Sequence, residues 1–124
     1  MKTERPVYLS LTQFGWPFTA IASITHRVTG VALFVGIAYL LWLLDMAVES
    51  AAGFAAAADV LSAPQAKLLL IAVLAALLYH LFAGIKHMFM DFGVGETLEA
   101  ARASSMATFV LTAVATVLLG IWLW

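Results

Sequence analysis

The chain has 124 residues and a net charge of −1; 65% of its residues are hydrophobic, 10% are charged and none is a cysteine. Soluble domains carry about 25% charged residues, and one of this size leaves too much surface exposed to hide so many apolar side chains. The composition therefore predicts an integral membrane protein. The charge gives no electrostatic basis for binding nucleic acid, and the absence of cysteine excludes disulfides, thiolate metal sites and iron–sulfur ligation by this chain.

The N-terminal segment, residues 1–6, has the sequence Met-Lys-Thr-Glu-Arg-Pro. No apolar stretch follows its basic residues before the proline, as a secretory signal peptide requires, and it is too short and too poor in serine for a transit peptide. We therefore expect the chain to begin where the mature protein begins. This favours a bacterial membrane over that of an organelle reached by import.

Three stretches without charged residues follow, covering residues 28–44, 68–85 and 103–124. The first extends upstream to Phe18, since Pro17 stands at a natural helix start. A helix of about 20 apolar residues crosses the hydrocarbon layer of a bilayer, and a chain in lipid must satisfy its backbone hydrogen bonds internally. We predict an all-α integral membrane protein with transmembrane helices over about residues 18–48, 66–90 and 103–124, in one domain covering residues 1–124.

The two connections between the spans are short. Residues 49–65 are rich in alanine, contain Gly53 and Pro64 as helix breakers, and predict a surface helical turn. Residues 91–105 contain Gly93 and Gly95, followed by a predicted short helical lead-in to the third span over residues 97–102. The sequence contains no internal repeat.

Lysine and arginine near the span ends predict the orientation, because short cytoplasmic loops carry an excess of these residues. Only Lys67 lies between the first and second spans. The other five lie before the first span or between the second and third: Lys2, Arg5, Arg27, Lys86 and Arg102. We therefore expect a multi-pass protein of the bacterial inner membrane, with a cytoplasmic N-terminus and a periplasmic C-terminus.

Polar residues inside the spans indicate function, because a charge at mid-membrane costs about 2.5–3.5 kcal/mol on insertion scales. One polar stripe opens the first span. Its members, spaced i, i+3, i+4 and i+7, share one helix face: Ser23, His26, Arg27 and Gly30.

A second polar stripe closes the second span. Its members, spaced i, i+4, i+7 and i+11, also share one face: His80, Gly84, His87 and Asp91. Because the first two spans are antiparallel, the start of one and the end of the other lie at the same depth. We therefore expect both stripes in the cytoplasmic half of the membrane.

The histidines favour a haem site. A neutral imidazole in a dry setting suits haem iron as an axial ligand, and His80 lies within the hydrocarbon layer. Gly84, one turn further on, removes a side chain from the face that a flat macrocycle would occupy. His26, Arg27 and His87 lie nearer the interface and are candidates to hold the haem propionates by charge-assisted hydrogen bonds. His80 and His87 point the same way, so a second axial ligand must come from another helix or chain.

Ser23 and Arg27 favour a quinone as well. A hydroxyl and a guanidinium one turn apart can hydrogen-bond a quinone carbonyl, and the arginine stabilises the negative charge that develops when the quinone takes an electron. Each residue also has a structural interpretation when taken alone, as a packing group, a close-contact glycine or an interfacial anchor. The occurrence of both stripes at one depth favours the functional interpretation.

Three motifs resemble the cytochrome b membrane-anchor subunit of succinate dehydrogenase (respiratory complex II). They are Arg-Pro-Val-Tyr-Leu-Ser-Leu at residues 5–11, Ala-Ser-Ile-Thr-His-Arg-Val-Thr-Gly at residues 22–30 and His-x-x-x-Gly-Ile-Lys-His-x-x-x-Asp-Phe-Gly at residues 80–93. The resemblance covers nearly the whole chain, including its length and three spans. Lys86 departs from the family's usual arginine; it keeps the charge but loses the planar fork, so no propionate contact is carried over to it.

The resemblance implies that His80 is the axial ligand of haem b and that Ser23 and Arg27 belong to the ubiquinone pocket. His26, Arg27 and His87 match positions near the haem propionates. The second haem ligand would come from the other small anchor subunit, so this chain would be half of a heterodimeric haem-binding anchor. The pair would hold an iron–sulfur subunit and a flavoprotein. FAD, the iron–sulfur clusters and succinate oxidation would belong to those partners, which leaves no catalytic residue for succinate in this chain.

Other interpretations make different predictions. A purely structural anchor, or the anchor of a fumarate reductase, shares the fold; the first predicts no haem and a dispensable Ser23. A transporter or proton-conducting subunit is disfavoured, because Asp45, Glu49 and Asp91 all lie at span ends and transporters usually show repeats or broken helices. A dihaem cytochrome with His26 as a second ligand predicts twice as much haem per chain.

Overall fold

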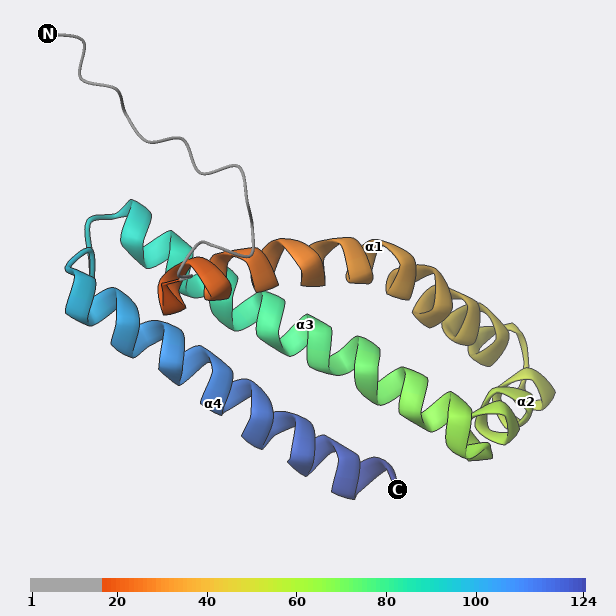
Figure 1. Cartoon of the computed structure of the whole chain (residues 1–124). Coiled ribbons are helices and arrows are strands. Elements are labelled where there is room, and N and C mark those ends of the chain that lie inside the picture. Colours follow the sequence, from red (N-terminus) through yellow and green to blue (C-terminus); the bar gives the residue numbers. More distant parts are fainter. Residues whose placement is uncertain (1–16) are drawn as a thin grey trace, which may run out of the picture.

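The computed structural model describes residues 17–124. This part of the chain folds into four helices: α1 (Phe18–Glu49), α2 (Ala51–Ser62), α3 (Pro64–Asp91) and α4 (Leu98–Leu123). The three long helices run in alternating directions, with α3 between α1 and α4, and α2 lies at one end (Figure 1). Each long helix is long and apolar enough to cross a membrane. This confirms the predicted all-α integral membrane fold with three transmembrane helices. Lys2, Arg5 and the motif at residues 5–11 lie outside the described residues.

The helix ends follow from local sequence. Pro64 occupies the first turn of α3, where its missing N–H costs nothing, and the side chain of Thr97 caps α4 by accepting from the amide of Ala100 at 3.2 Å. At the end of α3, Gly93 adopts a φ of 78°, which favours glycine. The amide of Gly93 donates to Met90 and that of Val94 to Phe89, the Schellman pattern that satisfies the last carbonyls of a helix.

Both connections contain more helix than the sequence predicted. The predicted surface turn in residues 49–65 is the twelve-residue helix α2. Alanine is the strongest helix former, and Gly53 does not break α2 because it lies in the first turn, where its amide donates to the capping hydroxyl of Ser50 at 3.0 Å. The predicted lead-in at residues 97–102 is not separate, since α4 runs without a break from Leu98.

α1 and α3 pack closely enough to require a glycine. Gly36 is buried in α1, and a Cβ atom there would lie 2.9 Å and 3.1 Å from the two methyl carbons of Val73. We expect Gly36→Ala to lower the stability of the protein by about 1–3 kcal/mol. The side chain of Val73 is branched at Cβ, so its χ1 angle has little freedom to move the methyl groups away from a new Cβ. Thermal unfolding of the protein purified in detergent measures the effect.

Gly120 provides a matched control for this prediction, since in the described part of the chain a Cβ at that residue would meet nothing within 4 Å beyond its own helix backbone and chain neighbours. Gly120→Ala should leave the melting temperature unchanged or raise it. Adding Val73→Ala to Gly36→Ala should restore part of the lost stability. Equal melting temperatures for Gly36→Ala and the wild-type protein would contradict a close contact between α1 and α3 at this point.

Candidate functional site

The two polar stripes meet, as the antiparallel arrangement of the first two spans predicted. The rings of His26 on α1 and His80 on α3 stack with centroids 4.1 Å apart and planes 14° from parallel. The ring of His87, two turns along α3, lies 5.1 Å from that of His26. Three imidazoles from two helices therefore form one group, which we call the histidine cluster: His26, His80 and His87.

Hydrogen bonds fix the orientation of the His80 ring. Its Nδ1 lies 3.1 Å from the carbonyl oxygen of His26 and 3.3 Å from the hydroxyl of Thr29. That hydroxyl donates to the same carbonyl at 2.9 Å. A carbonyl oxygen only accepts, so in a neutral ring the proton is on Nδ1 and the lone pair is on Nε2. Among the described residues no side chain or backbone group hydrogen-bonds Nε2, which leaves it free to bind a ligand.

Glycines on each helix make room for the histidine of the other. A Cβ at Gly30 would lie 3.1 Å from Cε1 of His80, a tighter approach than side chains normally make. The atom nearest to a Cβ at Gly84 would be Nε2 of His26, at 3.6 Å. We expected Gly84 to leave space for a macrocycle; within this chain, the side chain bordering that space is the imidazole of His26.

Tyr79, next to His80 in the sequence, sets the rotation of α3 against α1. Its hydroxyl donates to the carbonyl of Ala22 at 2.8 Å, both residues are buried, and its ring packs 4.9 Å from that of Phe109 on α4. Sequence reasoning missed Tyr79 and Thr29. One signal for Tyr79 was present, because a tyrosine hydroxyl in an apolar span needs a hydrogen-bond partner.

Ser23 and Arg27 lie beside the histidine cluster rather than inside it. Ser23 is half-buried and Arg27 is exposed. At 3.6 residues per turn, Ser23 lies about 100° and Arg27 about 140° around α1 from Ala22, which places both on the flank of the face that contacts α3. Neither side chain makes a hydrogen bond with another described residue, so a hydroxyl and a guanidinium are available next to the cluster.

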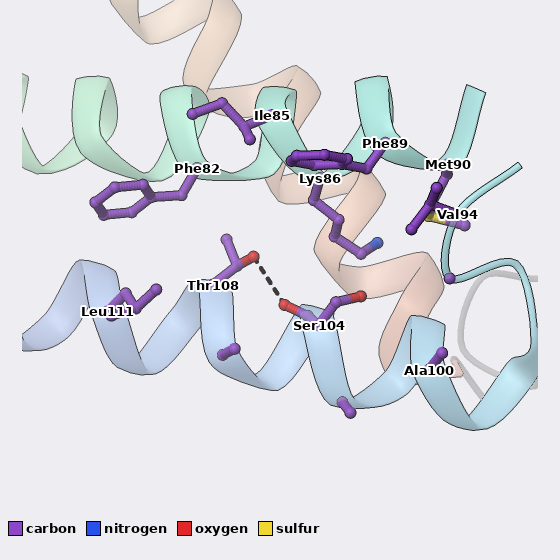
Figure 2. A pocket seen from close by; sticks show the side chains of 13 residues that line it. Phe82, Ile85, Lys86, Phe89, Met90, Val94, Ala100, Ser104, Thr108 and Leu111 are labelled. Atoms are coloured by element: carbon purple, nitrogen blue, oxygen red, sulfur yellow. Dashed lines mark hydrogen bonds between the residues drawn. The ribbon is translucent and has the colours of Figure 1, made fainter. Parts of the chain in front are cut away.

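The remaining members of the second stripe have different surroundings. His87 is half-buried, and its Nδ1 donates to the carbonyl of Ala83 at 2.7 Å, so its Nε2 is the nitrogen left for other contacts. Asp91 is exposed at the end of α3. Lys86 points the other way, into the space between α3 and α4 (Figure 2). Its position in this space directs Lys86 away from the histidine cluster.

The histidine cluster is not a complete metal site by itself. The described residues hold no group of three or more histidine, cysteine, aspartate or glutamate side chains placed to bind a metal ion. His80 nevertheless presents one oriented nitrogen, Nε2, whose ring is held by its bonds to α1. A metal bound there has to bring most of its ligands with it, as the iron of a macrocycle does.

Comparisons with known proteins agree with the resemblance noted in the motifs. The family model described as succinate dehydrogenase/fumarate reductase transmembrane subunit matches residues 1–119. The chain is 41% identical to the succinate dehydrogenase cytochrome b556 subunit of Coxiella burnetii over 125 residues, which covers all of both chains. It is 40% identical to the subunit of the same name from Paracoccus denitrificans, covering 93% of this chain and 88% of the relative.

A mitochondrial protein is also related. The succinate dehydrogenase cytochrome b560 subunit of Bos taurus is 30% identical over 117 residues, which cover 92% of this chain and 69% of the relative. Three membrane-spanning helices, the matching family model and these identities lead to one conclusion. The chain belongs to the family of succinate dehydrogenase/fumarate reductase transmembrane subunits.

Proposed function

We propose that this chain is the haem b-binding membrane anchor of a succinate:ubiquinone oxidoreductase and forms part of its ubiquinone site. The observation that carries the proposal is the ring of His80, whose Nδ1 is held by the carbonyl of His26 and the hydroxyl of Thr29 while Nε2 remains free. The names of the relatives, succinate dehydrogenase cytochrome b subunits, support the same assignment.

The surroundings of His80 fit a haem ligand. Histidines that bind metals usually donate their other ring N–H to a carbonyl or carboxylate, which fixes the tautomer and the ring orientation. Gly30 allows the ring to lie close against α1. When bound, haem supplies reversible one-electron chemistry. The rings of His26 and His87 pack against the same group as His80, so a second haem ligand would come from the other small anchor subunit.

Charged and polar groups near His80 suit the haem propionates. Arg27 is exposed at the cluster, and His87 has one ring nitrogen free after bonding Ala83. His26 stacks directly on His80, so its imidazole would lie beside a haem held by His80 and could hydrogen-bond a propionate. Charge-assisted hydrogen bonds from such groups are about twice as strong as neutral ones. Gly84 adds no side chain on this face of α3.

Ubiquinone binds beside the haem, at Ser23 and Arg27. The two side chains lie one helical turn apart and form no hydrogen bond with another described residue. Ser23 donates to a quinone carbonyl, and Arg27 provides a fixed positive charge near the same oxygen. Positive charge placed in advance where negative charge develops lowers the barrier to reduction. FAD, the iron–sulfur clusters and the succinate site belong to the flavoprotein and iron–sulfur subunits.

The histidine cluster lies at the cytoplasmic end of the bundle, in the bacterial inner membrane. Arg27, Lys86 and Arg102 belong to this end, whereas Lys67, near the start of α3, belongs to the other. The excess of basic residues on one side supports a cytoplasmic N-terminus and a periplasmic C-terminus. In this orientation the haem and quinone groups lie next to the iron–sulfur subunit on the cytoplasmic surface.

Purification of the intact complex through a tag on this chain tests the proposal. We expect three further subunits to co-purify and a reduced-minus-oxidised spectrum with one haem b per copy of the chain. A purely structural anchor predicts the same subunits without haem absorbance. Two haems per chain would instead support the dihaem arrangement with His26 as a ligand.

Thr29 is a positioning residue for His80. Thr29→Val keeps the shape of the side chain but removes the hydroxyl that lies 3.3 Å from Nδ1, and the loss of such an outer partner typically weakens metal affinity about 10–100-fold. We expect haem to dissociate more readily from the Thr29→Val complex, and its midpoint potential to change. Thr29→Ser restores the hydroxyl and should behave like the wild type. Identical haem retention and potential in the valine and serine variants would contradict this role.

A further inference from the structure

A cavity between α3 and α4 plays no part in the proposed haem and quinone chemistry. It is an open depression with a volume of about 570 Å³, which is in the usual range for small-molecule sites. Its walls are mostly apolar and include Phe82 and Phe89 from α3 and Leu111 from α4. The side chain of Lys86 extends from α3 into it, toward α4 (Figure 2). We call this cavity the α3–α4 groove.

Among the residues that the structure describes, Lys86 is the only charged one that lines the α3–α4 groove. The two hydroxyls in the wall already donate hydrogen bonds within α4. Ser104 donates to the carbonyl of Ala101 at 3.1 Å, and Thr108 donates to that of Ser104 at 2.9 Å. Lys86 makes no hydrogen bond or ion pair with another described residue. The groove therefore offers one free cationic donor in an apolar setting, which suits a ligand with a negative head and an apolar body.

The depth of Lys86 fits a membrane lipid. Lys86 lies five residues before Asp91, the last residue of α3, which corresponds to about 7.5 Å along the helix axis. This is the level at which headgroup and acyl chain meet near the end of a span. Phe82 and Leu111 line the groove on the deeper side, toward the centre of the bilayer, where an acyl chain would lie.

We propose that the α3–α4 groove binds an anionic phospholipid of the cytoplasmic leaflet, with its phosphate on the Lys86 ammonium and an acyl chain against Phe82 and Leu111. A soluble anion would leave the apolar walls uncovered. A zwitterionic lipid would fill the walls, but the cation of its headgroup would offset the attraction between its phosphate and Lys86. Lys86 lies six residues after His80 and about 120° around α3 from it, so this site is separate from the haem and quinone groups.

Native mass spectrometry of the intact complex tests the proposal. The complex is delipidated in detergent and then titrated with phosphatidylglycerol or with phosphatidylcholine of the same acyl chains. One lysine near the membrane surface strengthens anionic lipid binding by about fivefold in affinity. We expect the wild-type complex to hold one more phosphatidylglycerol than phosphatidylcholine per copy of this chain, and Lys86→Gln to weaken that binding about fivefold.

Two variants make the outcome specific. Arg102→Gln removes an equal charge from an exposed residue at the same end of the bundle, outside the wall of the groove, and should retain the lipid. Ala107→Leu places extra carbon atoms in the wall and should displace the lipid while leaving Lys86 in place; it provides the comparison if Lys86→Gln fails to assemble. Equal binding of the two lipids, or equal loss in Lys86→Gln and Arg102→Gln, would overturn the proposal.

Discussion

Replacing His80 with alanine should remove the six-coordinate haem b signal from the assembled complex. The substitution deletes the one imidazole whose Nε2 is free and whose Nδ1 is anchored to α1. Reduced-minus-oxidised spectra of wild-type and His80→Ala complexes, purified in the same way, measure the effect. We expect the α-band either to be lost with the haem or to be replaced by the spectrum of haem bound through one ligand.

His26→Ala is the matched control for this experiment. It removes the ring that stacks on His80 but leaves the backbone carbonyl that holds Nδ1. We expect this variant to keep one haem per chain, with a shifted potential, whereas a dihaem cytochrome would lose half of its haem. An unchanged haem b spectrum in the His80→Ala complex would refute the assignment of His80 as a ligand.

Substitutions of Ser23 and Arg27 should separate the two partial activities of the complex. In Ser23→Ala and Arg27→Leu, succinate oxidation with a soluble dye acceptor should continue, because the proposed function assigns the flavin reaction to another subunit. Reduction of ubiquinone should fall, by about 100-fold for Arg27→Leu, since the loss of one group that stabilises developing charge costs about that much. Parallel steady-state assays with dye and quinone acceptors measure both rates.

Two substitutions elsewhere in the chain control for general damage. Arg102→Leu removes the other exposed arginine at the same end of the bundle, and Thr112→Val removes a hydroxyl that bonds only its own helix, at the carbonyl of Thr108. Both should leave the two rates unchanged. If Ser23→Ala and Arg27→Leu lowered the dye and quinone rates equally, their role would be structural and the quinone site would lie elsewhere.

Much of the fold was predictable because lipid restricts the alternatives. The absence of charge located three spans, and the antiparallel run of α1 and α3 placed both polar stripes at one depth. Helix periodicity then identified which residues share a face of one helix. It could not predict how far each helix is rotated against its neighbour, because that depends on packing. In the structure, the bond from Tyr79 to Ala22 sets this rotation.

The rotation explains what the residue pattern missed. It turns His26 and Gly30 toward His80, while Ser23 and Arg27 remain on the flank. The i+3 and i+4 spacings had placed all of them on one face. The hydroxyl of Thr29 reaches His80 for the same reason. The extent of α2 was missed because Gly53 was interpreted as a breaker, although a glycine in the first turn interrupts little of the helix.

The rotation of α3 also divides its polar residues between two sites. His80 faces α1, whereas Lys86 extends toward α4, although the sequence places them only six residues apart. Neither polar stripe includes a residue of the third span. In the structure, α4 supplies one wall of the groove that receives Lys86, so it has a part in the proposed lipid site.

The central claim is that Nε2 of His80 binds haem iron. An experimental density map of the intact complex, resolved well enough to place side chains around the anchor, tests this most directly. The account predicts one haem held by Nε2 of His80 and by a residue of the second anchor subunit, with Nδ1 still facing the carbonyl of His26 and the hydroxyl of Thr29. A haem held by other residues, or no haem beside His80, would contradict it.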